Sequence, residues 1–176
     1  MPIPSRGDIY HIEIAEGECV GRELKGGHWW VVLSNEKLNA FVQLFTAVPL
    51  TSVLNKNTGI PKDEGNFRFF KVRVLSTSKK NDPGRKDKIF EGDSIALTEQ
   101  ARTLSVERIT EPRAGTVDGD GLAAIEAGLL FVINARISRQ PSVELPAQLA
   151  HTAPRVVVPA EPPRPLPGKP LDPKSK

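Results

Sequence analysis

Two side chains beside apolar segments are candidates for chemistry in this sequence. His28 stands just before an apolar run, and a histidine can accept or donate a proton because it titrates near neutral pH. Thr51 follows a second apolar segment and carries a hydroxyl that can donate a hydrogen bond. Cys19 is the single cysteine, which excludes an intrachain disulfide and a cysteine-based zinc site. No cluster of metal-ligating side chains stands out, so we expect neither a metal ion nor another cofactor.

These candidates need a scaffold, and the hydrophobic pattern predicts mainly β structure. It predicts strands at residues 8–14, 29–33, 41–50, 67–75 and 94–98, the last continued by 101–104 past a bend. Turn-forming residues predict two exposed loops, 55–65 and 76–88. Apolar residues at helical spacing predict one helix over 118–135, opened by acidic side chains. This order favours an α+β fold, mainly β, in which the helix closes a small barrel.

The composition changes near Ser138. Ten of the 16 prolines follow Arg139, and residues 140–176 contain no aromatic side chain. Such a segment buries too little apolar surface to offset its chain entropy. We therefore expect a folded domain over residues 1–138 and a disordered proline-rich tail over 139–176. Residues 162–165 have the composition that a proline-binding module recognises, although a solvated linker or tail is the more common meaning of such a segment.

Charge and hydropathy limit the compartment and the partners. The net charge of +3 and the pI of about 9.1 permit a polyanionic partner without demanding one. Residues 1–20 carry five charged side chains, which does not fit a secretory signal peptide. The longest apolar segment, 122–133, is too short to span a bilayer. We expect a cytoplasmic protein that does not enter membranes.

Four segments, in order, resemble the MazF/PemK family of toxin endoribonucleases of type II toxin-antitoxin systems. They are Arg6-Gly7-Asp8-Ile9-Tyr10, the stretch from Gly21-Arg22-Glu23 to Ser34-Asn35, Val48-Pro49-Leu50-Thr51-Ser52, and the stretch from Gly92-Asp93-Ser94 to Arg108-Ile109. The similarity extends over roughly residues 5–135. Each segment alone is weak, whereas four in the right order are fairly specific.

The resemblance implies a homodimer of SH3-like barrels that cleaves single-stranded RNA. In that chemistry the 2′-hydroxyl attacks its own phosphodiester, which needs proton transfer and hydrogen-bond donors but no metal ion. It also implies a cognate antitoxin, a protein that blocks the RNA groove with an acidic segment that orders on binding.

The resemblance also implies a catalytic pair, and this sequence departs from it. Thr51 takes the place of the family's threonine, but His28 stands where the family has arginine and Trp29 where it has proline. Arginine is a fixed charge, whereas histidine can act as a general acid or base. The replacement either changes the division of labour or abolishes activity. A simpler interpretation is also open, because a lone histidine at the start of a strand is often a structural residue hydrogen-bonded to the backbone.

Six further residues stand at or beside family positions that contact RNA. They are Arg22, Glu23, Asn35, Ser52, Gln100 and Arg102. Extended polar side chains such as Asn35 and Gln100 can read the edges of unstacked bases. Arg102 suits a phosphate contact or a dimer interface equally well. Ordinary surface or turn positions explain the same residue types.

Other side chains admit two interpretations. Trp29 and Trp30 alternate across a strand, so one belongs in the core and the other can pack or stack on a base. The basic run Lys79, Lys80, Arg85, Lys86 and Lys88 reads as a solvated loop that can also reach phosphate.

Two other functions stay open. The same barrel without catalysis would be an RNA- or protein-binding module, a reading that His28 favours. A gyrase-directed toxin is known on a related barrel, but such a protein has no use for a phosphate-binding pair.

Overall fold

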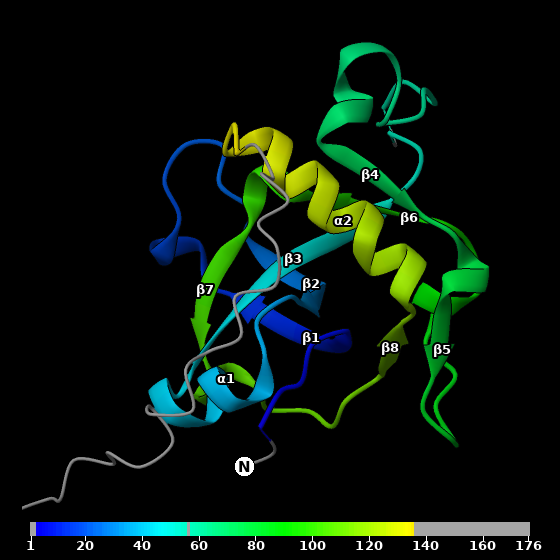
Figure 1. Cartoon of the computed structure of the whole chain (residues 1–176). Coiled ribbons are helices and arrows are strands. Elements are labelled where there is room, and N and C mark those ends of the chain that lie inside the picture. The colour runs from blue at the N-terminus through cyan, green and yellow to red at the C-terminus, as the bar shows by residue number, and fades with distance from the viewer. Residues whose placement is uncertain (1–2, 56, 136–176) are drawn as a thin grey trace, which may run out of the picture. The chain divides into compact units, whose positions relative to one another are not determined.

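The described part of the polypeptide forms one antiparallel sheet and two helices. The computed structural model describes residues 3–55 and 57–135 (Figure 1). The strands are β1 (Asp8–Ile14), β2 (Gly26–Val32), β3 (Leu44–Ser52), β4 (Lys71–Val74), β5 (Lys79–Asn81), β6 (Ser94–Leu97), β7 (Arg102–Ser105) and β8 (Gly115–Val117). The helices are α1 (Glu36–Val42) and α2 (Gly119–Val132). Short 3₁₀ turns span Glu16–Glu18, Gly65–Phe69, Ser76–Ser78, Lys88–Phe90, Thr98–Gln100 and Val106–Arg108.

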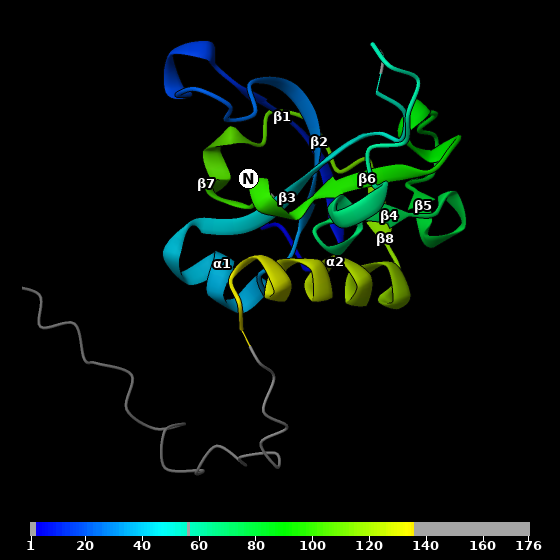
Figure 2. The same ribbon diagram turned by 90° about the horizontal axis from the view of Figure 1, so that it is seen from above.

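The strand order is β4-β6-β3-β2-β1-β8-β5, with β7 paired to β3. α2 lies across one face of the sheet in both views (Figures 1 and 2). This is the expected α+β, mainly β architecture, an antiparallel barrel of the SH3-like type followed by a helix. The domain end at residue 138 and the tail of residues 139–176 lie outside the described residues.

The central strands β1 and β2 are buried on both faces. Ile9 and Val31 pair across them and enter one apolar core, together with Leu122 and Ile125 of α2. The alternate residues Tyr10 and Trp30 also pair and enter a second core. A strand that contributes to two cores reads as a continuous apolar run, which is why residues 29–33 were recognisable without alternation.

β3 carries the candidate hydroxyl near its C-terminal end, inside the sheet. Its first half, Leu44 to Ala47, pairs with β7, and its last residues, Leu50 to Ser52, pair with β6. On its other side, residues 47–50 pair with β2. The end of β3 therefore lies between β2 and β6, where Leu50 is buried and Thr51 is only half-buried. A strand held on both sides gives Thr51 a fixed position.

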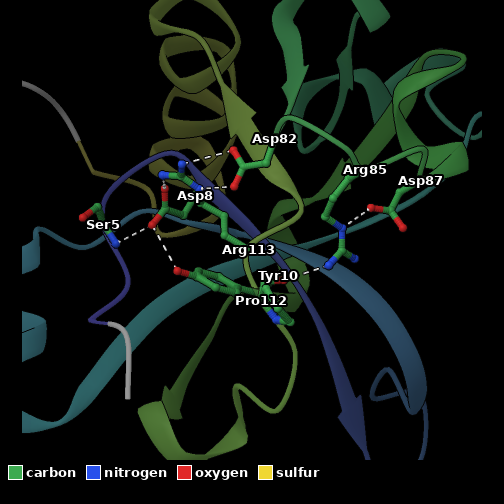
Figure 3. A network of polar contacts seen from close by, with 8 residues as sticks. All are labelled: Ser5, Asp8, Tyr10, Asp82, Arg85, Asp87, Pro112 and Arg113. Carbon is green, nitrogen blue, oxygen red and sulfur yellow. Dashed lines mark hydrogen bonds and ion pairs between the residues drawn. The ribbon is translucent and has the colours of Figure 1, made fainter.

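A buried carboxylate links the start of β1 to the segments beside β8 and β5. Asp8, whose side chain is 5% exposed, accepts from Arg113 Nη1 at 3.0 Å and from the Ser5 amide at 2.8 Å (Figure 3). The Tyr10 hydroxyl donates to it at 3.3 Å. Arg113 also binds both oxygens of Asp82, at 2.9 and 3.1 Å. The network joins the segments around β1, β5 and β8, which neighbour one another in the sheet.

The network changes the pKa values of Tyr10 and Arg113. Burial first, and the adjacent Asp8 charge second, raise the pKa of the Tyr10 phenol well above its ordinary value. The ion pair with Asp82 and the one with Asp8 raise the pKa of Arg113 as well. At neutral pH the Tyr10 phenol is therefore neutral and the Arg113 guanidinium is charged.

α2 begins and packs as its sequence dictates. The Asp118 side chain caps the first turn by accepting from the Gly121 amide at 2.9 Å. Gly128 lies so close to β4 that an added Cβ would meet Val72 Cγ2 at 2.5 Å. The helix ends at Val132, before the predicted end at residue 135.

Two predicted strands were wrong at their starts. Residues 36–42 form α1, and Gln43 adopts a left-handed backbone (φ 55°) before β3 begins at Leu44. The apolar side chains of Phe41 and Val42 suggested a strand, yet both are exposed. Residues 65–69 form a 3₁₀ turn, so that β4 is shorter than the predicted strand 67–75.

The loop predicted at 76–88 was also wrong in part, and β8 was not predicted. β5 lies within that loop and pairs with β8. Three-residue strands are too short to leave a periodic pattern. The predicted continuation 101–104 is instead β7, which pairs with β3. Lys79, assigned to a solvated basic run, is buried at 6% exposure.

Candidate active site

His28 and Thr51 meet at the ends of β2 and β3. The pairing of β2 with β3 ends at Trp29 and Leu50, and His28 and Thr51 are the next residues beyond this pair. Opposed side chains on antiparallel strands are separated by only ~5 Å at their Cβ atoms. Both residues line an open pocket of about 280 Å³. Its lining residues are Gly27, His28, Trp29, Leu50, Thr51, Ser52, Lys62 and Ile89.

The Thr51 hydroxyl is oriented by a lysine. Lys62 Nζ donates to Thr51 Oγ1 at 2.8 Å and to Ser52 Oγ at 3.3 Å. An ammonium group has no acceptor, so it occupies an oxygen lone pair and leaves the hydroxyl proton to another partner. Ser52 gives its proton to the Leu54 carbonyl at 3.2 Å. Among the described residues no acceptor takes the Thr51 proton, which is therefore available to a ligand oxygen.

The His28 ring is oriented by the backbone. Its Nε2 lies 3.1 Å from the Lys25 carbonyl oxygen. A carbonyl only accepts, so Nε2 carries the proton and Nδ1 carries the lone pair of the neutral ring. A ring fixed in this way can accept a proton at Nδ1. The backbone hydrogen bond that residue type alone suggested is thus present, and it coexists with a place in the pocket.

The opposite wall is held by buried Lys79. Its Nζ donates to the Gly92 carbonyl at 2.7 Å, to Ser94 Oγ at 2.6 Å and to the Ile89 carbonyl. Ile89 lines this pocket and a neighbouring hollow that reaches Asp93. Burial lowers the pKa of Lys79 to about 8, against a smaller opposing effect of Asp93. Lys79 thus fixes the segment that closes the site instead of offering its charge to a ligand.

The two tryptophans divide as expected. Trp30 is fully buried in the second core, whereas Trp29 is half-buried and lines the pocket. Trp29 also makes an edge-to-face contact with His11, with ring centroids 5.1 Å apart. One face of this strand therefore builds the core while the other reaches the site.

A second group of predicted residues gathers around the β1–β2 loop. Glu23 pairs with Arg102 at 3.2 Å. Gln100 accepts from the Leu24 amide at 3.2 Å and donates to the Arg22 carbonyl at 3.5 Å. Four of the predicted RNA-binding residues thus form two contacting pairs, Glu23 with Arg102 and Gln100 with Arg22. None of the four lines the pocket.

Asn35 has a different local task. Its side-chain oxygen accepts from the Leu38 amide at 2.8 Å and caps α1. It does not line the pocket of His28 and Thr51 either. The sequence Ser34-Asn35-Glu36 already carries the pattern of a helix start, with a capping side chain and an acid in the first turn.

Lys62 is the pocket residue that sequence reasoning missed. It comes from the loop predicted at 55–65, where a lysine reads as a solvated charge. Only the folded path of the loop brings it to Thr51. No local pattern indicated this contact.

The described part of the chain holds no group of three or more His, Cys, Asp or Glu side chains arranged for a metal ion. Over the same residues, no helix is both long enough and apolar enough to cross a membrane.

Comparison with known proteins found a family match and similar solved structures. The family described as PemK-like, MazF-like toxin of type II toxin-antitoxin system matches residues 5–133. No curated protein matches the chain. The crystal structure of MazF from Deinococcus radiodurans is 19% identical, covers 76% of this chain and 99% of its own, and has a TM-score of 0.53. A MazE–MazF structure from the same organism is 18% identical over 77% of this chain and 100% of its own, with a TM-score of 0.50.

At this level of identity the two structures show a shared fold. The family match covers well over half of the sequence, including both strands that meet at the pocket. The chain belongs to the PemK-like, MazF-like toxin family of type II toxin-antitoxin systems.

Proposed function

We propose that this protein is a metal-independent endoribonuclease that cleaves single-stranded RNA in the His28–Thr51 pocket. The observation that carries the proposal is the hydroxyl of Thr51, held by Lys62 so that its proton faces a ligand. Donors fixed before the substrate arrives stabilise charge that develops in the transition state. Membership of a toxin family known for endoribonucleases supports the same activity.

In the proposed reaction, His28 Nδ1 takes the proton of the 2′-hydroxyl. The 2′-oxygen attacks phosphorus, the bond to the 5′-oxygen breaks, and that oxygen takes a proton from water. The resulting hydroxide neutralises the imidazolium, so no proton is gained or lost overall. Thr51 donates to a non-bridging phosphate oxygen throughout. The products are a 2′,3′-cyclic phosphate and a 5′-hydroxyl.

The residues around the β1–β2 loop extend the proposed RNA path. Arg22 is exposed, while Gln100 and the Glu23–Arg102 pair hold that loop in place. Trp29 and Ser52 line the pocket itself and suit contacts to the nucleotides beside the scissile bond. Asn35 stays a proposed base contact, separate from the pocket.

The proposed partners follow the family. We include a cognate antitoxin, because the Deinococcus relative is described as a MazE–MazF complex. We also include a second copy of the chain. Exposed apolar side chains support a protein contact at the end of α2, where Phe131 stacks on Phe69 with ring centroids 5.2 Å apart. Light scattering of the purified protein tests the dimer. Cytoplasmic action, where mRNA is present, completes the proposal.

The test is cleavage of a long single-stranded RNA in EDTA, from acidic to mildly alkaline pH. We expect discrete fragments from the wild type, a strong loss with Thr51→Ala, and a changed pH profile with His28→Ala. Intact RNA with folded, antitoxin-free wild type at every pH would refute the activity.

A binding module without catalysis is the second candidate. The observation that favours it is His28 in place of the family's arginine, with Nε2 bonded to a backbone carbonyl. This candidate predicts RNA retention without products. His28→Ala would then change affinity only.

A further inference from the structure

Phosphodiester cleavage needs a fixed positive charge that His28 does not supply permanently. Negative charge accumulates on the phosphate oxygens as the 2′-oxygen attacks, and a cation placed there lowers the barrier. Arginine holds its charge at any relevant pH, whereas a neutral imidazole offers none. Of the described residues that line the pocket, Lys62 is the one with a lysine or arginine side chain.

We infer that Lys62 is a catalytic residue that binds the scissile phosphate and supplies the charge otherwise expected from arginine. This inference rests on the proposed ribonuclease activity. Its geometric basis is the contact of Lys62 Nζ with Thr51 Oγ1 at 2.8 Å. A phosphate oxygen that accepts from Thr51 must lie near that ammonium group, because both donors meet at one hydroxyl oxygen.

The loop is built to return Lys62 to the end of β3. The Lys62 amide donates to the Val53 carbonyl at 2.9 Å, and the Asn55 amide donates to the Ile60 carbonyl at 3.0 Å. Leu54 and Pro61 form a β-bridge between these two bonds. The adjacent Asp63 is fixed by Arg73 through two bonds of 2.9 Å each. Backbone pairing on one side and an ion pair on the other make this a structured loop.

Lys62 also stands where RNA must pass. It lines the 280 Å³ pocket and, on its other side, a hollow of about 620 Å³ that contains Phe67 and Lys71. Lys71 Nζ lies 4.6 Å from the centroid of the Phe67 ring. A strand that crosses from one hollow to the other carries a phosphate past Lys62.

The test compares Lys62→Met, Lys62→Arg and a matched control, Lys37→Met, on the exposed helix α1. Single-turnover cleavage of a long mixed-sequence RNA is the first readout. We expect Lys62→Met to be about 10²-fold slower, as for loss of one transition-state donor, and Lys62→Arg to keep most of the rate. Lys37→Met removes the same charge elsewhere and should cleave like wild type. Thermal unfolding identifies any variant that fails to fold. If Lys62→Met does not fold, Lys62→Gln, which also removes the charge, replaces it in both readouts.

The second readout does not need cleavage. Binding of a fully 2′-O-methylated RNA is measured over a range of salt concentrations. Loss of one phosphate contact should reduce the slope of log K against log salt by about 0.7 in Lys62→Met only.

These readouts separate the inference from the proposed function. If the wild type cleaves and Lys62→Met cleaves equally fast, the role of Lys62 is wrong while the activity stands. If the wild type does not cleave, the activity fails, and the salt slope still decides whether Lys62 contacts phosphate. An unchanged slope overturns the inference in either case.

Discussion

The Asp8 network and the Thr51 pocket use the same kinds of polar side chain in opposite ways. Around Asp8, each charge is matched by a partner in the fold, and the carboxylate is almost fully buried (Figure 3). At Thr51, the hydroxyl accepts from Lys62, and among the described residues no acceptor takes its proton. A saturated network stabilises the fold, whereas an unsaturated one is available for chemistry.

This contrast separates sequence motifs that stabilise the fold from those that line the pocket. The segment Arg6-Gly7-Asp8-Ile9-Tyr10 is polar and distinctive, yet its acid and its phenol serve to join three segments of the sheet. Gly7 there has a positive φ of 92°, which favours glycine. The segment ending Leu50-Thr51-Ser52 is less distinctive but faces the pocket. A motif therefore identifies the family without indicating which of its residues perform chemistry.

Asp8→Ala should show the largest effect. It removes three hydrogen bonds to a buried carboxylate, from Arg113, Tyr10 and the Ser5 amide, which together should cost about 3 kcal/mol. Chemical denaturation measures the free energy of unfolding. The control is Asp82→Ala, which removes the more exposed acid of the same arginine and should cost about 1 kcal/mol. Equal denaturation midpoints for Asp8→Ala and wild type would show that the network does not stabilise the fold.

Thr51→Val should lower the rate of RNA cleavage and leave the stability of the fold almost unchanged. Valine has nearly the same shape and a β-branched side chain, so the free energy of unfolding should change by less than about 0.5 kcal/mol. Single-turnover RNA cleavage should fall about 10²-fold or more because a phosphate donor is lost. Thr51→Ser keeps the hydroxyl and should keep most of the rate. Wild-type rates in the valine variant would place the chemistry elsewhere.

Lys79→Met tests the buried residue that holds the segment beside the pocket. The pKa of Lys79 is about 8 in the fold, below its ordinary 10.5. Between these values the unfolded chain holds a proton that the folded chain has released, so stability rises with pH. The expected rise is about 2 kcal/mol between pH 8 and about 10, and Lys79→Met should lack it. Denaturation at several pH values measures this, and parallel pH profiles would contradict the assignment.

Tyr10→Phe should have the smallest effect, about 1 kcal/mol from one long hydrogen bond. Its pH signature has the opposite sign to that of Lys79. The pKa of Tyr10 is raised, so above the ordinary value of 10.0 the unfolded chain loses a proton that the folded chain keeps. Wild-type stability should fall in that range, and the phenylalanine variant should not show this fall. Denaturation above pH 10 checks it, and an equal fall in both proteins would mean that Tyr10 is not the group responsible.

Much of the fold could be predicted because long strands leave patterns. β1 matches its predicted bounds, since alternating Ile12 and Ile14 leave the polar Glu13 outside. α1 was missed because Phe41 and Val42 are apolar yet exposed, which a pattern cannot distinguish from burial. β5 and β8 were missed because their pairing joins residues that are distant in the sequence.

Less of the candidate site could be predicted from the sequence. The resemblance supplied His28 and Thr51, and strand register brings them together. Lys62 reaches the site through the path of a loop, and Lys79 holds the segment beside the site through buried hydrogen bonds. No local sequence pattern encodes either contact. The roles of Arg22, Glu23, Asn35, Ser52, Gln100 and Arg102 in RNA binding stay predictions.

The most direct measurement is the chemistry of the cut ends. Wild-type protein is incubated in EDTA with a long single-stranded RNA and with DNA of the same sequence, and the fragment ends are analysed. Attack by the 2′-hydroxyl predicts RNA fragments with 2′,3′-cyclic phosphate and 5′-hydroxyl ends, and intact DNA. Fragments with 5′-phosphate ends, cleavage of the DNA, or RNA that stays intact would contradict the account.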